Sequence, residues 1–85
     1  MNIRFTKQAD KDYKKLPIQI QKKADKQFIF LSSDYHHPSL NSRKMGGENK
    51  FEGRVDYKYR FTFLIEGEEI YILTVGLHDE GLGKK

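Results

Sequence analysis

The feature that most restricts the fold is an alternation of large apolar and polar residues, interrupted by one turn. In the first run the odd positions are bulky: Tyr57, Tyr59, Phe61, Phe63 and Ile65, with Lys58, Arg60, Thr62 and Leu64 between them. Glu66-Gly67-Glu68 follows, a polar segment with glycine that suits a hairpin turn. In the second run Ile70, Ile72 and Thr74 alternate with Tyr71, Leu73 and Val75. A period of two is typical of strands, so residues 57–75 predict a β-hairpin.

Pairing the two runs assigns a face to each side chain. With the turn at Glu66-Gly67 or at Gly67-Glu68, one face carries Phe61, Phe63, Ile65, Ile70, Ile72 and Thr74. This face is the more apolar one, and we expect it to meet the core. The opposite face would carry Lys58, Arg60, Thr62 and Leu64 beside Tyr71, Leu73 and Val75. Such a mixed, open face is suited to a ligand or a partner.

The N-terminal part of the chain reads as a strand and two helices. Residues 2–5 predict a short strand, and Thr6 is a good N-cap for a helix that ends at Pro17. Apolar residues recur at helical spacing in this helix (Ala9, Tyr13, Leu16) and in the next (Ile20, Ala24, Phe28, Leu31). The second helix fades at Ser32-Ser33-Asp34. The short link at Pro17 indicates an antiparallel helical hairpin.

Residues 35–55 lack helical spacing. We expect a loop over 35–39, a short strand over 40–45, a turn at Gly46-Gly47 and a second strand over 50–55. The complete order indicates a single α+β domain over residues 1–85, with an antiparallel sheet covered by the helices on one face.

Charge and composition restrict the class of protein. The formal net charge is +4, from 16 Lys and Arg against 12 Asp and Glu, which favours phosphate backbones, anionic proteins or membranes as partners. The chain has no cysteine, so disulfides and cysteine-based zinc sites are excluded. No run is long and apolar enough to span a membrane, and we expect a soluble, cytoplasmic protein.

Six short segments occur in an order that resembles a known family. They are His37-Pro38-Ser39-Leu40, Arg43-Lys44-Met45-Gly46, Phe51-Glu52-Gly53-Arg54, Tyr59-Arg60-Phe61-Thr62-Phe63, Glu66-Gly67 and Val75-Gly76-Leu77-His78-Asp79. This order resembles the RelE/ParE superfamily of type II toxins, and the C-terminal histidine is similar to that of its YoeB-like and YafQ-like branches. The resemblance implies a ribonuclease-type fold, a co-expressed antitoxin and cleavage of mRNA, often on the ribosome. The superfamily also contains ParE, which inhibits DNA gyrase without a nuclease site, and an inactive member that only binds antitoxin is a third alternative.

Metal-independent RNA cleavage needs a cation, an acid and a base. Arg60 is the candidate for the cation because a guanidinium matches phosphate oxygens; pairing with Glu69 or Glu52 is its structural alternative. His78 is the candidate acid or base, and Asp79 could orient it. Glu52 and His37 compete for the role of general base. No metal or other cofactor is needed.

Further cations and aromatic residues around Arg60 are candidate RNA contacts. These are Arg43, Lys44, Lys50, Arg54, Tyr57 and Lys58, with Lys44 expected nearest the scissile phosphate. The basic, partly apolar sheet face should also accept an acidic antitoxin segment that folds on binding, giving a toxin–antitoxin hetero-oligomer. Strict alternation places Arg60 and His78 on opposite faces, so the mechanism predicts a break or bulge in the last strand near Gly76.

Overall fold

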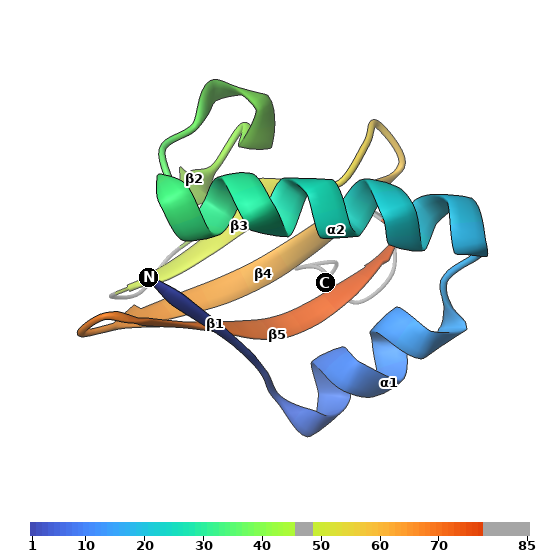
Figure 1. The fold of residues 1–85 in the computed structure, drawn as a ribbon, viewed down its shortest axis with the longest axis horizontal. Helices are drawn as coiled ribbons and strands as arrows, with labels where there is room; N and C mark the ends of the chain where they lie inside the picture. The colour runs from blue at the N-terminus through green and yellow to red at the C-terminus, as the bar shows by residue number, and fades with distance from the viewer. Residues whose placement is uncertain (46–48, 78–85) are drawn as a thin grey trace.

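In the computed structural model, which describes residues 1–45 and 49–77, two helices lie on one face of a twisted sheet (Figure 1). The elements are β1 (Asn2–Phe5), α1 (Lys7–Lys15), α2 (Ile18–Ser33), the 3₁₀ helix η1 (Pro38–Leu40), β2 (Arg43–Lys44), β3 (Lys50–Arg54), β4 (Tyr59–Glu66) and β5 (Glu69–Leu77). The described strands form one sheet in the order β1-β5-β4-β3-β2, with β1 parallel to β5 and the other pairs antiparallel. The predicted α+β order of strand, helical hairpin and antiparallel sheet is confirmed.

The helices begin and end where the sequence predicted. The Thr6 hydroxyl accepts a hydrogen bond from the backbone N–H of Ala9 (3.1 Å) and donates one to the carbonyl of Ile72 (3.0 Å), so one side chain caps α1 and attaches it to β5. The chain reverses at Pro17, and α2 then runs across the sheet to Ser33. None of the described helices is long and apolar enough to cross a membrane.

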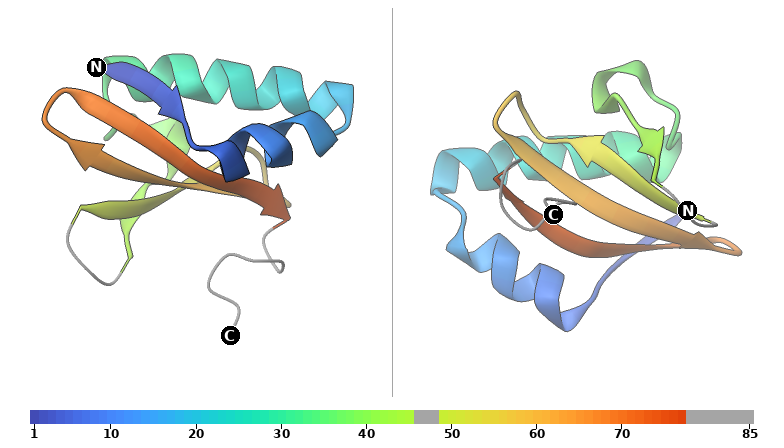
Figure 2. Two further views of the ribbon diagram at one scale, coloured as in Figure 1. Left: turned by 90° about the horizontal axis from the view of Figure 1, so that it is seen from below. Right: turned by 180° about the vertical axis from the view of Figure 1, so that it is seen from behind.

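The core lies between α2 and the centre of the sheet. Phe61, Phe63, Ile70 and Ile72 are fully buried on the face that meets the helices. Phe28 of α2 packs edge-on against Phe61, with 5.1 Å between the ring centroids. The opposite face of β3, β4 and β5 is not covered by any described element (Figure 2). Any function that needs an accessible sheet surface therefore belongs to that face.

A β-bulge corrects the predicted face of the last strand. Thr62 pairs with Thr74 and Phe63 pairs with Ile72, so Leu73 has no partner on β4. The extra residue reverses the alternation beyond it: Val75 becomes a core residue with 4 % of its surface exposed. Thr74 lies instead on the open face, where its hydroxyl is 2.7 Å from that of Thr62. The predictions that Thr74 is inward and Val75 outward were wrong.

Two segment boundaries also differ from the prediction. Leu40 is not in a strand; it ends η1 and is fully buried, while the strand is reduced to Arg43 and Lys44. Tyr57 and Lys58 precede β4 rather than belonging to it, because the Asp56 side chain accepts backbone hydrogen bonds and forms a turn there. The turn expected at Gly46-Gly47 lies outside the described residues, and the Glu66-Gly67-Glu68 turn is confirmed, with Gly67 at φ 61°.

Candidate functional site

The open face contains a hollow of about 310 Å³ near the first residues of β4. Its lining residues are Asn41, Arg43, Glu52, Arg54 and Arg60, and we refer to it as the sheet-face pocket. Strand register explains why they meet: Arg43 lies opposite Glu52, and Arg54 lies opposite Arg60. Side chains directly across a ladder share a face. The pocket is therefore built by three neighbouring strands and the residue that follows η1.

The pocket has an excess of positive charge. Three guanidinium groups line it together with a single carboxylate, that of Glu52. Glu52 is 6 % exposed, and its Oε1 accepts a hydrogen bond from Nε of Arg43 at 3.1 Å. Asn41 has a left-handed backbone (φ 48°). With its side-chain amide turned so that the oxygen faces Arg54, it accepts from both terminal nitrogens of Arg54, at 3.1 and 3.2 Å. Three cations around one buried anion make this an anion-binding geometry.

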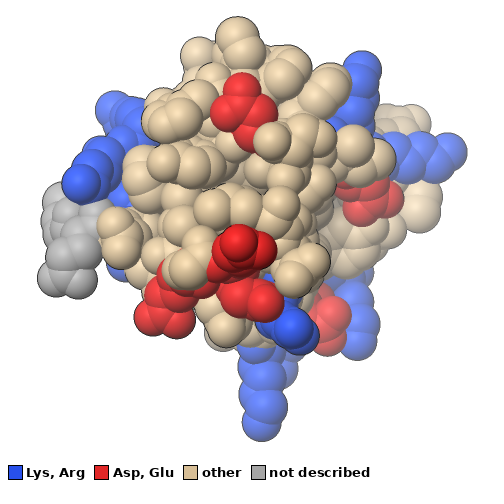
Figure 3. All heavy atoms as spheres, turned by 60° about the vertical axis from the view of Figure 1, so that its left-hand side comes forward, with Lys and Arg blue, Asp and Glu red and all other residues tan. Residues whose placement is uncertain are grey.

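Acidic side chains gather at the other end of the same hairpin. Glu66, Glu68 and Glu69 surround the β4–β5 turn, and Glu69 is paired with Arg4 of β1. Figure 3 looks at this end of the molecule, where acidic groups lie together near the front and the cations lie mostly toward the edges of the view. The hairpin therefore has a cationic end and an anionic end.

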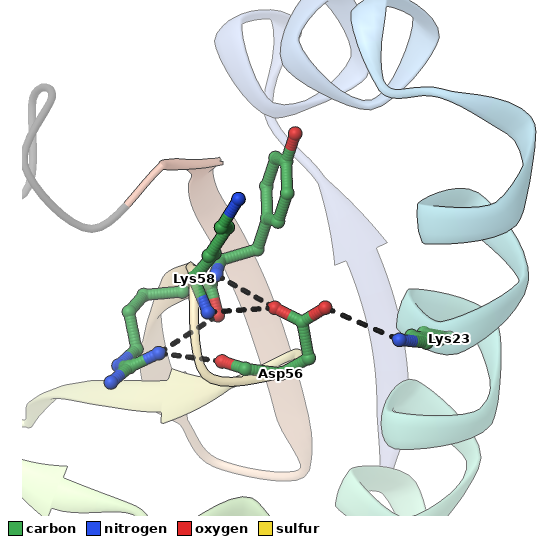
Figure 4. Close-up of polar contacts among 5 residues, drawn as sticks. Lys23, Asp56 and Lys58 are labelled. Carbon is green, nitrogen blue, oxygen red and sulfur yellow. Dashed lines mark hydrogen bonds and ion pairs between the residues drawn. The ribbon is translucent and has the colours of Figure 1, made fainter.

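Arg60 is held by backbone carbonyls. Its Nη1 donates to the carbonyl oxygen of Asp56 (2.6 Å) and to that of Tyr59 (3.2 Å). The carboxylate of Asp56 accepts from the N–H groups of Lys58 and Tyr59, both at 2.9 Å, and lies 3.4 Å from Nζ of Lys23 on α2 (Figure 4). The Asp56 turn therefore sets the position of the Arg60 guanidinium, which is bonded to neither Glu52 nor Glu69.

Hydrogen bonding keeps Asp56 ionised. Partial burial raises the pKa of its carboxyl, but the hydrogen bonds from Tyr59 N–H, Lys58 N–H and Lys23 together outweigh burial. The pKa is consequently lowered from its ordinary value. Asp56 thus remains a charged link between α2 and the turn that holds Arg60.

The structure brings some predicted site residues together and separates others. Arg60, Glu52, Arg43 and Arg54 line one pocket. His37 does not line it. Its ring stacks on that of Phe30, with 4.2 Å between the ring centroids. Its Nδ1 accepts a hydrogen bond from the N–H of Ser39 at 3.2 Å and so caps η1. His78 lies outside the described residues. The irregularity of β5 is the bulge at Leu73, three residues before Gly76, and the strand continues through Gly76 to Leu77. Gly76 pairs with Arg60.

The remaining predicted RNA contacts are spread around the pocket. Lys50 lies on β3, on the face of Glu52 and Arg54. Lys44 lies opposite Phe51, on the other face of the edge strand. Lys58 and Tyr57 belong to the β3–β4 loop, where Tyr57 is 74 % exposed and its ring lies 5.9 Å from Nζ of Lys58.

Asn41 is a site residue that the sequence did not reveal. Its only sequence signal is the tolerance of asparagine for a left-handed backbone just after a helical turn. Among residues 1–45 and 49–77, no three His, Cys, Asp or Glu side chains are grouped as a metal site would require.

Comparison with known proteins identifies the fold. Neither family models nor curated protein sequences give a match. Solved structures do match. The YoeB/ParE toxin from Agrobacterium tumefaciens superposes with a TM-score of 0.80 at 13 % identity, covering 92 % of this chain and 99 % of that one. The YoeB–YefM complex from Staphylococcus aureus gives 0.77 at 19 % identity, covering 92 % and 97 %.

An archaeal structure agrees with the bacterial ones. The RelB–RelE antitoxin–toxin complex from Methanococcus jannaschii gives a TM-score of 0.75 at 22 % identity, covering 89 % of this chain and 91 % of that one. These likenesses extend over nearly the whole length of both chains. The chain has the fold of the RelE/ParE superfamily of toxins.

Proposed function

We propose that this protein is the toxin of a type II toxin–antitoxin system and that it acts in the cytoplasm as an endoribonuclease on mRNA at the ribosome. The observation that carries the proposal is the sheet-face pocket, where three guanidinium groups surround one buried carboxylate on the uncovered face of a toxin fold. This combination of charges suits a phosphodiester: cations for the phosphate and a carboxylate for a proton.

The proposed roles follow from the chemistry of RNA cleavage. A base must take the proton of the 2′-hydroxyl, a cation must stabilise the charge on the phosphorane, and an acid must protonate the leaving 5′-oxygen. Arg60 supplies the cation, exchanging its bond to the Asp56 carbonyl for a phosphate oxygen. One preorganised donor of this kind contributes about 10²–10³ in rate.

Glu52 is favoured over His37 as the base. Glu52 shares the pocket with Arg60, whereas the His37 ring stacks on Phe30 and caps η1. His78 is proposed as the acid, because an imidazole titrates near neutrality. A positioned acid or base contributes about 10²–10⁴-fold. None of these roles requires a metal ion, so cleavage is expected to continue in a chelator.

An antitoxin is the proposed protein partner. The matching Staphylococcus aureus and Methanococcus jannaschii structures are complexes of YoeB with YefM and of RelE with RelB. The net charge of +4 favours an acidic partner segment that folds on binding, and the affinity should fall as salt is raised.

Single substitutions test the proposal. Arg60→Ala and His78→Ala should each abolish RNA cleavage and growth arrest without unfolding the protein, measured by RNA gel, growth curve and circular dichroism. Arg4→Ala is the matched control, because Arg4 is an exposed arginine of the same sheet that pairs with Glu69 and does not line the pocket. A gyrase inhibitor would instead cause DNA damage and be indifferent to His78→Ala. For a member that only binds antitoxin, neither the wild type nor any of these variants would arrest growth.

A further inference from the structure

A second hollow lies on the helix side of the same strand end. It has a volume of about 470 Å³ and lies between α2, η1 and the loop that joins β3 to β4; we refer to it as the helix-side hollow. Lys23 and Lys26 of α2 line it together with Arg54 and Asp56, and Phe30 and Val55 supply an apolar wall. Single-stranded nucleic acids bind to cations that contact the phosphates and to aromatic side chains on which the bases stack.

The charges of this hollow are not all compensated. Lys23 is paired with Asp56, with 3.4 Å between Nζ and Oδ2. Lys26 is exposed and forms no ion pair with any described residue. Arg54 is half-buried and likewise forms no ion pair with a described residue. Neither charge is therefore compensated by an ion pair within the described part of the chain.

Arg54 connects the two hollows. It lines the sheet-face pocket as well as the helix-side hollow, because it is the last residue of β3. Its carbonyl accepts a hydrogen bond from Nε2 of Gln27 at 2.8 Å, and the same nitrogen donates to the carbonyl of Ser39 at 2.9 Å. Gln27 is only 8 % exposed. One buried amide thus fixes the end of β3 against both α2 and η1, so the two hollows have a fixed relative position.

We infer that the helix-side hollow is a second phosphate subsite for the same nucleic-acid strand, so that RNA runs from the sheet-face pocket past Arg54 to Lys26 on α2. The identity of the strand as RNA rests on the proposed function; the preference for a polyanion rests on the charges above. The consequence is a dependence on length. A dinucleotide fills the sheet-face pocket alone, whereas a longer strand also contacts Lys26.

Uncleavable oligonucleotides test this inference apart from catalysis. A fluorescent 2′-O-methyl dinucleotide and octanucleotide are titrated with the wild-type protein, with Lys26→Gln and with Lys22→Gln over a series of salt concentrations. Lys22 is the matched control, an exposed lysine of α2 that does not line the hollow. We expect Lys26→Gln to weaken octanucleotide binding several-fold and to reduce the slope of log K against log salt by about 0.7, the value for one phosphate contact with a single strand. Dinucleotide binding should stay unchanged in both variants.

Three results would overturn the inference. The first is that the wild type binds the octanucleotide no more tightly than the dinucleotide. The second is that Lys22→Gln weakens octanucleotide binding as much as Lys26→Gln does, which would indicate a general effect of the charge on α2. The third is that a polyglutamate peptide competes for the octanucleotide site with the same dependence on Lys26. Failure of the proposed function has a different signature. A protein that never cleaves RNA but keeps the dependence on length and on Lys26 retains the subsite and loses the nuclease.

Discussion

Glu52 supplies the single negative charge among the residues that line the sheet-face pocket, and its removal should separate binding from cleavage. Glu52→Gln keeps the hydrogen-bond acceptor for Arg43 but leaves three guanidinium groups without a carboxylate. We expect tighter binding of an uncleavable oligonucleotide, by several-fold, together with a loss of cleavage of about 10²–10⁴. Fluorescence titration and single-turnover cleavage measure the two effects.

The control for this prediction is Glu68→Gln. Glu68 is an exposed carboxylate in the β4–β5 turn, outside the pocket, so neither binding nor cleavage should change at about 0.15 M salt, where distant charges are screened. Weaker binding by Glu52→Gln would mean that the carboxylate mainly holds Arg43 in place. Unchanged cleavage would remove Glu52 from the mechanism.

Asp56 should make part of the folding stability sensitive to acid. Its pKa is lowered in the folded protein, so the ionised form favours folding. This contribution is complete above the ordinary carboxyl pKa of about 3.9 and is lost as pH falls through the lower folded value. Asp56→Asn retains an oxygen for the turn but lacks the charge. The difference in unfolding free energy between wild type and Asp56→Asn should be constant at neutral pH and shrink below about pH 4, as measured by urea denaturation. A difference that grows on acidification would contradict this account.

The sequence predicted part of the site at the level of single residues. Arg60 could be placed on the open sheet face because it lies in a clear alternating strand, and Glu52 could be placed in the strand before it. Asn41 could not, because its contact with Arg54 depends on a left-handed backbone that brings two distant segments together. The contact between the Asp56 turn and Arg60 was also not predictable. The alternating pattern in the sequence includes Tyr57 and Lys58, whereas in the structure the Asp56 turn precedes the strand.

At the level of elements, the helices and the hairpin turn were predictable, and the bulge was not. Helix ends have local signals, such as the Thr6 cap and Pro17. In β5, however, Leu73, Thr74 and Val75 offer side chains that either face of the sheet could accept, so the pattern does not specify register there. Tertiary contact specifies it: the carboxylate of Asp12 on α1 accepts from the N–H of Val75 at 3.1 Å, and Val75 packs in the core. The predicted opposition of faces between Arg60 and His78 assumed a regular β5; His78 lies outside the described residues, and beyond the bulge Gly76 pairs with Arg60.

Two glycines of the sheet should differ in how much stability an alanine substitution costs. A methyl group on Gly53 would overlap Cζ of Phe61 and lie 2.8 Å from its Cε1, and this ring is fully buried against Phe28 and Phe63. Gly53→Ala should therefore destabilise the fold by about 1–3 kcal/mol, the usual range for an overpacked core. Gly76→Ala is the control in the neighbouring hairpin, since nothing described lies within 4 Å of its added methyl. It should change stability by less than about 1 kcal/mol.

Denaturant unfolding of the wild type and of three variants checks this prediction: Gly53→Ala, Gly76→Ala and a double variant. Gly53→Ala combined with Phe61→Leu should recover part of the loss due to overpacking, because the shorter side chain frees the space above β3. Equal stability of Gly53→Ala and the wild type would mean that the Phe61 ring moves aside without cost, and the tight contact would then not restrict residue 53.

For the molecule as a whole, the relevant property is the separation of charge along the β4–β5 hairpin. Arg60 begins this hairpin beside Arg54 and Arg43, while Glu66, Glu68 and Glu69 surround its turn. Glu66 lies six positions along the strand from Arg60, which is about 20 Å at roughly 3.3 Å per residue. A polyanion approaching the protein is therefore attracted to one end of the sheet and repelled from the other.

Charge reversal at the turn should change how fast a strand arrives but not how long it stays. Glu66→Lys combined with Glu68→Lys adds four units of positive charge about 20 Å from the pocket. Association with an uncleavable octanucleotide should accelerate at low salt. It should return to the wild-type rate near 0.15 M, where charges are screened over about 8 Å. At each salt concentration the dissociation rate should equal that of the wild type, because no pocket contact is altered. Arg54→Gln should do the opposite and speed dissociation, since Arg54 lines both hollows. Stopped-flow fluorescence separates the two rate constants, and slower dissociation of the charge-reversed protein at 0.15 M would mean that the strand also contacts the turn.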